Sequence, residues 1–421
     1  MNRKNVISLI TVFIILSSFT FAQKYSIPDN LEQYIKIERL SDRVRIIRMG
    51  SGDQYETVTA IATKKGIVVI DAGMNAPVTE IYKRLIEKEF NRKDFIYLIY
   101  THSHEDHIFG NRAFSGIEII GQENGKKEIL KKYKDNSYNT FWSGILKQNI
   151  DMYKGVDSNS IRGKEISLNI YRISGLLSEL ESNFAPPVPS IMFNDRMTLD
   201  MGDITIKLFY FGKAHTESDI LIYIPEEKLL FTGDLFRVLG EEQFDYYSKE
   251  NAEKWNSTLN EILNPAYDFK YIVNGHDKIT YSIDQLKIFN RNVQKIYKGY
   301  SEGKELYNYD RVNKALEKNG YDDLMVELQK LRTTESNKYI FLERRFRYIG
   351  IRLLGQNKTK EAIEIFKMNL ELFPESWYAS DRLAEAYLKA GNNDLAIVNY
   401  EKSIKLNPKN TNAVEQLKKL K

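Results

Sequence analysis

The sequence contains no cysteine and only five histidines in 421 residues. The lack of cysteine excludes disulfide bonds, thiolate metal ligands, a cysteine nucleophile and a lipidated N-terminal cysteine. The protein must therefore be stabilised by its apolar cores or by bound metal. The sequence also lacks a large excess of positive or negative charge, because 61 basic and 57 acidic residues give a formal net charge of only +4. This balance does not indicate nucleic-acid binding, and we expect none.

The chain is longer than one ordinary domain, and its N-terminus has the pattern of a secretory signal peptide over residues 1–22. Arg3 and Lys4 precede the apolar run Val6–Phe21, which at 16 residues is short for a membrane span. We expect cleavage after Ala22 and export to the periplasm or the medium, with no stable membrane anchor. An uncleaved anchor is the alternative.

Residues 23–302 alternate short apolar strands with amphipathic helices, which is typical of a layered α/β domain. Residues 76–90 predict a helix, and the continuous apolar run over 94–101 predicts a strand buried on both faces. A helical, aromatic insertion that shapes specificity is expected over about residues 122–193. Its aromatic residues could line an apolar pocket, although core packing is their commoner role: Tyr133, Tyr138, Phe141, Trp142, Phe184 and Phe193.

Residues 303–421 are expected to be helical throughout. A period of 34 aligns residues 343–376 with residues 377–410. Similar residues recur at matched positions: Gly350 with Ala384, Ala362 with Ala396, Phe366 with Tyr400, and Pro374 with Pro408. The two units resemble tetratricopeptide repeats. This resemblance implies either a surface for packing or self-association, or a site for a partner protein.

The segment THSHEDH, residues 101–107, holds three of the five histidines. It directly follows a strand predicted to be buried, and ligand sites in layered α/β folds gather at the C-terminal ends of strands. The rings of His102 and His104 can converge on one ion, whereas Asp106 and His107 suit a second ion beside it. Imidazole and carboxylate are ligands for zinc or a similar divalent metal.

The other two histidines also follow predicted strands. His215 lies in GKAHTESD and His276 in VNGHDK, and two acids have the same placement, Asp234 in FTGDLF and Asp71 in VVIDAG. One rim of a layered fold could therefore gather all of these side chains.

The ordered series VVIDAG, THSHEDH, AHTESD, FTGDLF and NGH resembles the metallo-β-lactamase-fold metallo-hydrolase superfamily over about residues 40–290. The resemblance implies an α/β fold of αββα sandwich architecture, followed here by the all-α tetratricopeptide-like domain. It implies a first metal site at His102, His104 and His215. It implies a second at Asp106, His107 and His276, with Asp234 bridging the two.

The resemblance gives Asp71 the role of bracing the ligand loop and a ligand histidine, as metal sites regularly require. An ordinary turn aspartate at the end of a strand is the alternative for this residue. Glu105, which lies between ligands, is expected to face solvent.

The implied chemistry is hydrolysis of an ester, thioester, lactone or related bond in a small molecule. Two divalent ions about 3.5–4 Å apart would hold a bridging hydroxide that attacks the substrate, with Asp106 orienting it. All seven ligand side chains would thereby take part in catalysis. Zinc is the expected metal, and the same donors also suit iron and manganese.

Other activities of the superfamily fit the sequence less well. The lack of cysteine excludes β-lactamases with a cysteine in the second site. A histidine-rich site, as in the all-histidine β-lactamase subclass and in thioesterase-like members, remains open. A bridging aspartate at Asp234 is more typical of thioesterase-like, lactonase and phosphodiesterase-like members. Alkylsulfatase-like members share export and an added helical region, but tend to carry glutamates in place of His215 and Asp234. A partner-binding repeat protein with a vestigial metal fold is the rival class, and the complete ligand set argues against it.

Overall fold

The computed structural model describes residues 31–51, 54–132, 137–154, 158, 161–181, 188–236, 249–276, 280–408 and 410–421. The predicted signal peptide and the residues Tyr133 and Phe184 lie outside these ranges. None of the helices that the structure describes is both long and apolar enough to span a membrane. The described residues form two compact units, one within 1–238 and 254–290, the other within 239–253 and 291–421. The domain boundary after residue 302 stays a prediction.

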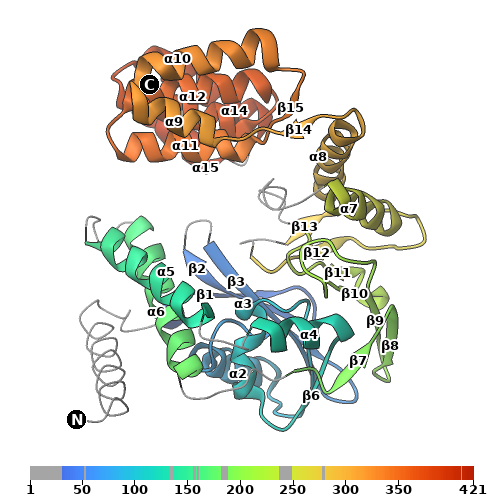
Figure 1. Cartoon of the computed structure of the whole chain (residues 1–421). Coiled ribbons are helices and arrows are strands. Elements are labelled where there is room, and N and C mark those ends of the chain that lie inside the picture. Colours follow the sequence, from blue (N-terminus) through green and yellow to red (C-terminus); the bar gives the residue numbers. More distant parts are fainter. Residues whose placement is uncertain are drawn as a thin grey trace, which may run out of the picture. The chain divides into compact units, whose positions relative to one another are not determined.

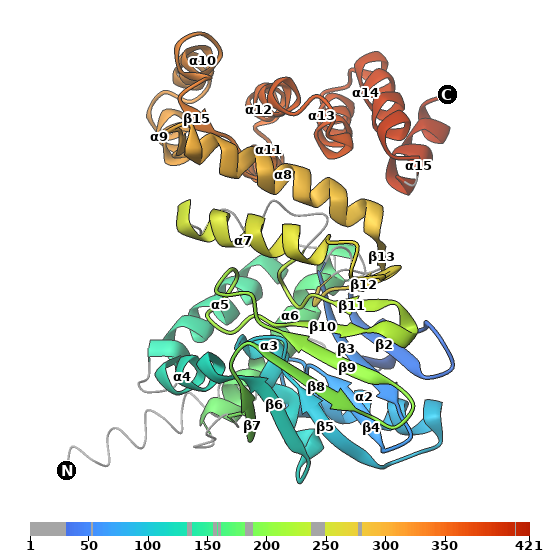
Figure 2. The ribbon, with the colours of Figure 1, turned by 90° about the vertical axis from the view of Figure 1, so that its right-hand side faces the viewer.

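The first unit contains two sheets that face each other (Figure 2). The first sheet has the spatial order β1 (Ile35–Arg39), β2 (Val44–Ser51), β3 (Gln54–Ala62), β4 (Ile67–Ile70), β5 (Phe95–Ile99), β6 (Glu118–Gln122) and β7 (Ile191–Phe193). The second sheet has the order β13 (Tyr281–Ser282), β12 (Tyr271–Val273), β11 (Leu229–Phe231), β10 (Leu221–Ile224), β9 (Thr205–Phe209) and β8 (Arg196–Asp200).

Helices complete the layers of this unit (Figure 1). They are η1 (Leu31–Tyr34), α2 (Ala76–Phe90), α3 (Glu105–Ile108), η2 (Phe109–Phe114), α4 (Glu123–Lys132), α5 (Ser137–Tyr153), α6 (Ile161–Glu181), η3 (Pro225–Glu227), α7 (Lys249–Ile262) and α8 (Ile283–Ser301), of which the last two extend beyond the unit. Two layers of strands between layers of helices confirm the predicted αββα sandwich.

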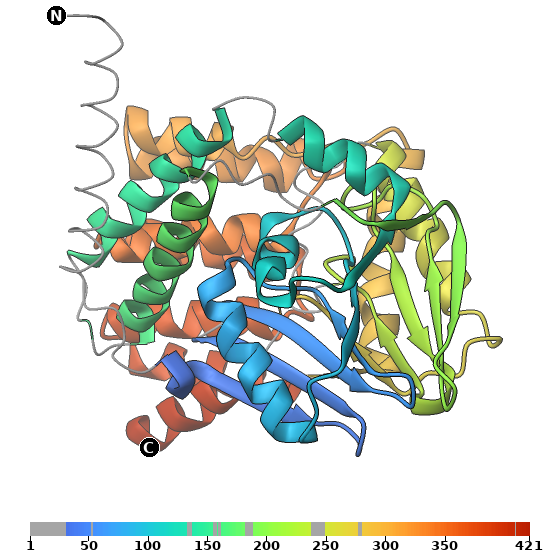
Figure 3. The ribbon, with the colours of Figure 1, turned by 90° about the horizontal axis from the view of Figure 1, so that it is seen from below.

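Strand β4 shows why the sheets are layered in this way. Alternate residues of a strand point to opposite faces. Ile67 and Val69 pack with the helices on the outer side, among them α2, which crosses this face in Figure 3. Val68 and Ile70 instead pack into the core between the two sheets. All four side chains are buried, as expected of a strand covered on both faces.

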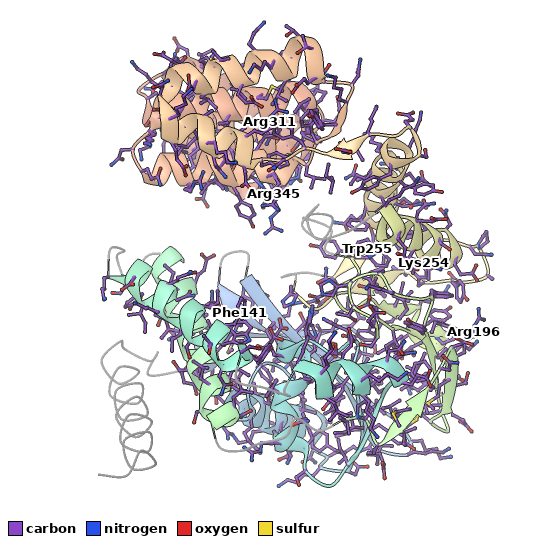
Figure 4. The ribbon with its side chains drawn as sticks, viewed as in Figure 1. Phe141, Arg196, Lys254, Trp255, Arg311 and Arg345 are labelled. Carbon is purple, nitrogen blue, oxygen red and sulfur yellow. The ribbon has the colours of Figure 1, made fainter. Side chains whose placement is uncertain are left out.

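The segment predicted as an insertion forms α4, α5 and α6. Its aromatic residues take different positions. Phe141 on α5 is 57% exposed (Figure 4), whereas the neighbouring Trp142 packs against the core beneath the first sheet. Phe193, at the end of β7, belongs to the core between the sheets. Trp142 and Phe193 therefore pack in the cores, which is the commoner of the two roles considered for these residues.

The outer face of the second sheet is covered through an aromatic cluster. Trp255 of α7, labelled in Figure 4, is fully buried. Its ring lies 6.5 Å from that of Phe236, just beyond β11, and 5.9 Å from that of Phe289 in α8. The first pair is edge-to-face and the second is tilted, and aromatic contacts at such distances add to the stabilisation from apolar burial. The cluster attaches both helices to the strand end that precedes Asp234.

The second unit consists mainly of helices, as predicted. They are α9 (Asp310–Lys318), α10 (Tyr321–Lys330), the π-helical turn η5 (Leu331–Glu335), α11 (Glu343–Gly355), α12 (Thr359–Leu372), α13 (Trp377–Lys389), α14 (Asn393–Leu406) and α15 (Thr411–Leu420), with a short strand pair β14 (Glu305–Leu306) and β15 (Tyr339–Ile340). Helices α11 and α13 begin 34 residues apart, at Glu343 and Trp377.

Small residues allow the helices of this unit to approach closely. A Cβ atom at Gly350 of α11 would lie 2.4 Å from the ring of Phe366 in α12. Ala384, Ala396 and Tyr400 form the corresponding contact of α13 with α14. The matched positions of the sequence repeat therefore occupy the helix contacts.

The turn after α3 provides a test of the fold around the first sheet. A Cβ atom at Gly110 would lie 1.9 Å from the carbonyl oxygen of Ala72 and from Oγ1 of Thr79. Because neither atom can move freely, we expect Gly110→Ala to lower the free energy of unfolding by about 3 kcal/mol. Gly144 in α5 has open space around its Cα atom, so Gly144→Ala should stabilise the protein by up to about 1 kcal/mol. Thermal melting compares the two variants, and equal melting temperatures would contradict this packing.

Candidate metal centre

The predicted site residues lie at the C-terminal ends of strands in both sheets. Asp71 follows β4 and the segment Thr101–His107 follows β5, its parallel neighbour. Asp234 follows β11 and His276 follows β12, which are likewise parallel neighbours. His215 lies in the loop after β9. Parallel strands bring their C-terminal ends to one edge, and the facing sheets bring the two edges together.

The structure gathers all seven predicted ligands. Their ligand atoms form three overlapping groups, and within each group the atoms lie within 4.8 Å of one another. The groups are His102, His104 and His215; His102, His107 and Asp234; and Asp106, His107 and His276. Asp234 contacts both ends of the cluster, with Oδ1 3.5 Å from Nε2 of His107 and Oδ2 3.7 Å from Nε2 of His215.

Asp71 is buried behind the cluster and contacts two parts of the ligand loop. Its Oδ1 accepts a hydrogen bond of 2.8 Å from the backbone N–H of Thr101. Its Oδ2 accepts from the Thr101 hydroxyl and from Nδ1 of His107, each at 2.8 Å. Asp71 reaches this position with a φ of 59°, which is uncommon for a residue other than glycine and marks local strain at a functional site.

The hydrogen bonds fix which nitrogen of each ring faces the cluster. Because the Thr101 hydroxyl donates to Asp71, it can accept from Nδ1 of His102, 3.0 Å away. Nδ1 of His276 lies 2.8 Å from the carbonyl oxygen of Tyr55, which can only accept. In His102, His107 and His276 the proton therefore lies on Nδ1. Nε2 of each ring therefore faces the cluster, where it offers a lone pair to a metal ion whenever the ring is neutral.

Several atoms of the cluster are electron-pair donors that a bound cation could engage. Nε2 of His102, Nε2 of His107 and Oδ1 of Asp234 are buried and have no hydrogen-bond partner among the described residues. Nδ1 of His104 and Nε2 of His215 face each other at 3.0 Å. Two ring nitrogens at this distance need a proton or a cation between them. Imidazole nitrogen and carboxylate oxygen suit zinc, iron or manganese, so these residues fit divalent metal ions.

The three histidines of the first predicted site are held in the neutral form. Burial, followed by the charges of neighbouring histidines, lowers the pKa of His102 and His104 well below its usual value. Burial likewise lowers the pKa of His215 to about 4. A neutral imidazole keeps the lone pair that binds metal, so these rings are ready to act as ligands near neutral pH.

The other side of the cluster has the opposite electrostatics. Burial opposes protonation of His107, but the carboxylates of Asp71, Asp106 and Asp234 outweigh it and raise its pKa to about 9. Burial also opposes ionisation of Asp106 and Asp234. The charges of His107 and His276 outweigh this effect and lower the pKa of both carboxyl groups. Asp106 and Asp234 are therefore anionic at neutral pH.

Gly275 has no side chain, and this absence makes room for two residues of the cluster. A Cβ atom at this position would lie 2.3 Å from Oδ1 of Asp234 and 2.6 Å from Cε1 of His107. The backbone N–H of Gly275 donates to the carbonyl oxygen of Gly233 at 3.0 Å. The glycine in VNGHDK therefore has a role that the sequence motif did not reveal.

Two carboxylates that position the ligand loops were missed by the sequence analysis. The first is Asp219, whose Oδ2 accepts from the backbone N–H of His215 at 2.6 Å and of Thr216 at 2.7 Å. Burial raises its pKa to about 7. Asp219 closes the motif AHTESD, four residues after the ligand, and this spacing was the available signal.

The second is Glu128 of α4, which joins two ligand loops. Its Oε2 accepts from the hydroxyl groups of Ser103 at 2.7 Å and Ser218 at 2.6 Å, and Oε1 accepts from the backbone N–H of Glu217 at 2.9 Å. No local pattern in the sequence connects these residues.

The expectation that Glu105 faces solvent is wrong. Glu105 is only half-buried by area, but it accepts a short hydrogen bond from the hydroxyl group of Tyr138 on α5. Burial raises the pKa of Glu105, with a further contribution from Asp106. The insertion therefore reaches the segment that carries the ligands.

A two-sheet sandwich with five histidines and two aspartates gathered at one edge defines a layered α/β metallohydrolase. The sequence also matches the family described as the Metallo-beta-lactamase superfamily over residues 52–276, more than half of the chain. The chain therefore belongs to the metallo-β-lactamase superfamily. It is a hydrolase of this superfamily with a histidine and aspartate metal site.

Individual relatives are distant. A Metallo-beta-lactamase type 2 from Elizabethkingia meningoseptica is 21% identical over 249 residues, which are 58% of this chain and 79% of that protein. The one from Bacillus cereus is 20% identical over 217 residues, which are 52% of this chain and 65% of that protein. A metallo-beta-lactamase structure from Pontibacter korlensis is 16% identical with a TM-score of 0.44, covering 62% of this chain and 99% of that one. No substrate is carried over from proteins at this distance.

Proton release should report which histidines bind metal. At about pH 7.5 His107 is protonated in the metal-free protein, because its pKa is raised to about 9, whereas His102, His104 and His215 are already neutral. Binding of Zn²⁺ should therefore release about one proton from His107 and none from the other three rings, in addition to any proton lost by metal-bound water. The contribution of His107 should disappear as the pH rises past about 9, so the total release should drop by about one proton. Titration calorimetry in buffers of different ionisation enthalpy measures it, and zero release at pH 7.5 would contradict the assignment.

Asp71→Asn tests the carboxylate behind the cluster. An amide NH₂ group in place of Oδ2 would face Nδ1 of His107 and favour the ring form whose proton lies on Nε2. We expect the protein to remain folded and its affinity for Zn²⁺ to fall about 10- to 100-fold, as measured by competition with a chelating indicator. The control is Asp94→Asn, which removes an exposed carboxylate beyond the other end of β5. Equal affinities in the two variants would leave Asp71 as an ordinary turn residue.

Proposed function

We propose that the protein is an exported hydrolase that uses two divalent metal ions, normally Zn²⁺, to cleave an ester, thioester, lactone or related bond of a small molecule. One observation supports it above the others. Three buried polar atoms, Nε2 of His102, Nε2 of His107 and Oδ1 of Asp234, meet at one edge of the sandwich without a hydrogen-bond partner among the described residues. A fold maintained only as a scaffold would not need to keep such atoms buried.

The ligands divide between the two ions by their contacts. His102, His104 and His215 would hold one ion. Asp106, His107 and His276 would hold the other, and both would share Asp234; these sets follow the first and third groups of the cluster. Bound divalent ions would supply Lewis acidity and a water molecule that ionises near neutral pH.

The protein's own residues prepare this reaction. Asp71 keeps the proton of His107 on Nδ1, and the carbonyl oxygen of Tyr55 does the same for His276. Asp106 is ionised, and its Oδ2 lies 3.1 Å from Nε2 of His276 at the edge of the cluster. Its carboxylate can therefore orient a water molecule or accept a proton from it.

β-Lactam hydrolysis is the second candidate, because the relatives described above are named metallo-beta-lactamases. Two features of the sequence oppose it. The chain has no cysteine for a cysteine-containing second site, and Asp234 is positioned to contact both halves of the cluster. Sulfate ester hydrolysis, as in alkylsulfatase-like members, is a further alternative with less support, since His215 and Asp234 stand where glutamates are usual there.

The remaining expectations form part of the same proposal. Residues 1–22 would direct export to the periplasm or the medium. The 34-residue spacing of α11 and α13 supports tetratricopeptide-like repeats over residues 343–410, which would bind a protein partner or a second copy of the chain. The alternative of a partner-binding protein with a vestigial metal fold conflicts with the complete set of seven ligands.

Metal content and two substitutions test the proposal. The wild-type protein should retain divalent metal after gentle purification, and clearly less than about one ion per chain would count against the proposal.

His102→Ala and Asp234→Ala should each lower hydrolysis at least about a hundredfold, since each removes a ligand. The assay panel contains esters, thioesters, lactones, phosphodiesters, sulfate esters and a chromogenic β-lactam. Asp200→Ala, which removes an exposed carboxylate on β8, is the matched control. Full activity of either ligand variant would show that the assigned centre is wrong.

A further inference from the structure

A cavity of about 680 Å³ is lined by α4, the beginning of α5 and the loop that follows His215. We call it the α4 cavity. Its volume lies in the range of small-molecule sites. Every residue that lines it is polar or charged, including Lys127, Lys131, Lys132 and Tyr138. These side chains present their aliphatic parts as well as their polar groups, so the lining suits a ligand that carries a charged group next to an apolar part.

The α4 cavity borders the metal centre through direct contacts. Nζ of Lys132 donates to the carbonyl oxygen of Ser103 at 3.3 Å, and Ser103 lies between two predicted ligands, His102 and His104. Glu217, which also lines the cavity, lies two residues after His215. Tyr138 donates to Glu105 in the segment that carries Asp106. A molecule bound at the metal centre could therefore extend into the cavity.

The charge of the α4 cavity is positive. Lys127, Lys131 and Lys132 line it, and none of them forms an ion pair with a carboxylate in the part of the chain that the structure describes. Both acids of the lining already have partners. Glu128 accepts hydrogen bonds from both ligand loops through its two oxygens, and Glu217 lies 2.5 Å from Nζ of Lys213. Lys127 and Lys131 are thus left to bind an anion, and the ammonium group of Lys132 has further donors besides the one that contacts Ser103.

Helix stability accommodates the three lysines, so the informative feature is that they line the same cavity. Lys131 and Lys132 lie in the last turn of α4, where positive charge is favourable for a helix. Lys127 follows Glu123 by four residues, a spacing at which opposite charges stabilise a helix. Three positive charges that line one cavity beside the candidate metal centre favour an anionic ligand.

We propose that the α4 cavity binds an anionic group of the substrate, a carboxylate, phosphate or sulfate, with Lys132 as the charge nearest to the metal centre. The substrate is then a molecule that carries its scissile bond at one end and a negative charge at the other. This inference rests on the proposed hydrolase function, because it assigns the second end of the same substrate.

Paired substrates test the inference on the zinc-loaded full chain. Each pair shares the scissile bond and differs in a remote group, which is either an anion or a neutral carboxamide of similar size. Wild-type protein should prefer the anionic member in kcat/KM. Lys132→Gln should reduce this preference about tenfold or more, mainly through KM, since a charge-assisted hydrogen bond contributes about that much. Carboxylate, phosphate and sulfonate pairs show which anion the site prefers.

Two further variants separate binding from damage to the ligand loop. Lys131→Gln removes a charge from the cavity without touching Ser103, and should also reduce the preference for the anionic substrate. Lys126→Gln, on the same helix but outside the lining, should leave the preference unchanged. Zinc content is measured in every variant. The proposal would be overturned if the wild-type enzyme showed no preference for the anionic substrate. It would also be overturned if Lys132→Gln and Lys131→Gln left the ratio of kcat/KM between the anionic and the neutral substrate unchanged.

A direct measurement of anion binding tests the anion site separately from the proposed hydrolase activity. Benzoate, benzenesulfonate and inorganic phosphate are titrated calorimetrically into wild-type protein and the lysine variants at low salt. Weaker binding in Lys132→Gln and Lys131→Gln but not in Lys126→Gln supports the anion site, even if no substrate of the panel is hydrolysed. Equal binding to all forms refutes the site, even if the panel reveals a hydrolase.

Discussion

The carboxylate of Asp71 is the contact on which the metal centre depends. It joins the end of β4 to the ligand loop after β5 through Thr101, and it sets the proton of His107. The same Thr101 hydroxyl group, which donates to Asp71, accepts the hydrogen bond from Nδ1 of His102 and so orients that ring as well. The left-handed backbone of Asp71 costs about 1 kcal/mol. Hydrogen bonds to a buried, charged acceptor are strong enough to offset it, because each contributes about 1.5–3 kcal/mol.

The electrostatics of the cluster follow from burial at this edge. One side presents neutral rings, His104 and His215 among them, whose nitrogens face each other. The other side collects the negative charges of Asp106 and Asp234 around a protonated His107. Neither side is stable by itself, since lone pairs oppose lone pairs on one and buried carboxylates accumulate on the other. Divalent cations relieve both conditions at once.

The sequence was sufficient to predict the ligands and the supporting carboxylate of Asp71, but not the supporting carboxylates of Asp219 and Glu128. Every predicted ligand directly follows a strand or lies in the loop after one, so its position can be inferred from local apolar patterns. Asp219 was within reach, because it hydrogen-bonds a ligand only four residues away. Glu128 was not, because its partners Ser103 and Ser218 lie 25 and 90 residues away. Contacts that join distant segments arise from the tertiary structure and leave no local pattern.

The helices of the insertion have two different structural roles: α6 packs in the core, and α4 contacts the loops that carry the metal ligands. Helix α6 is fixed in the core, where Arg172 donates to the carbonyl oxygen of Met49 at 2.5 Å and lies 3.7 Å from Glu56. Helix α4 instead contacts the ligand loops through Glu128 and presents its lysines to the cavity. Because the metal ligands come from strand ends and the lysines from α4, Lys127 and Lys131 can change while the ligands stay in place, whereas Lys132 also contacts the ligand loop at Ser103. A superfamily fold can in this way keep one chemistry and vary its substrate.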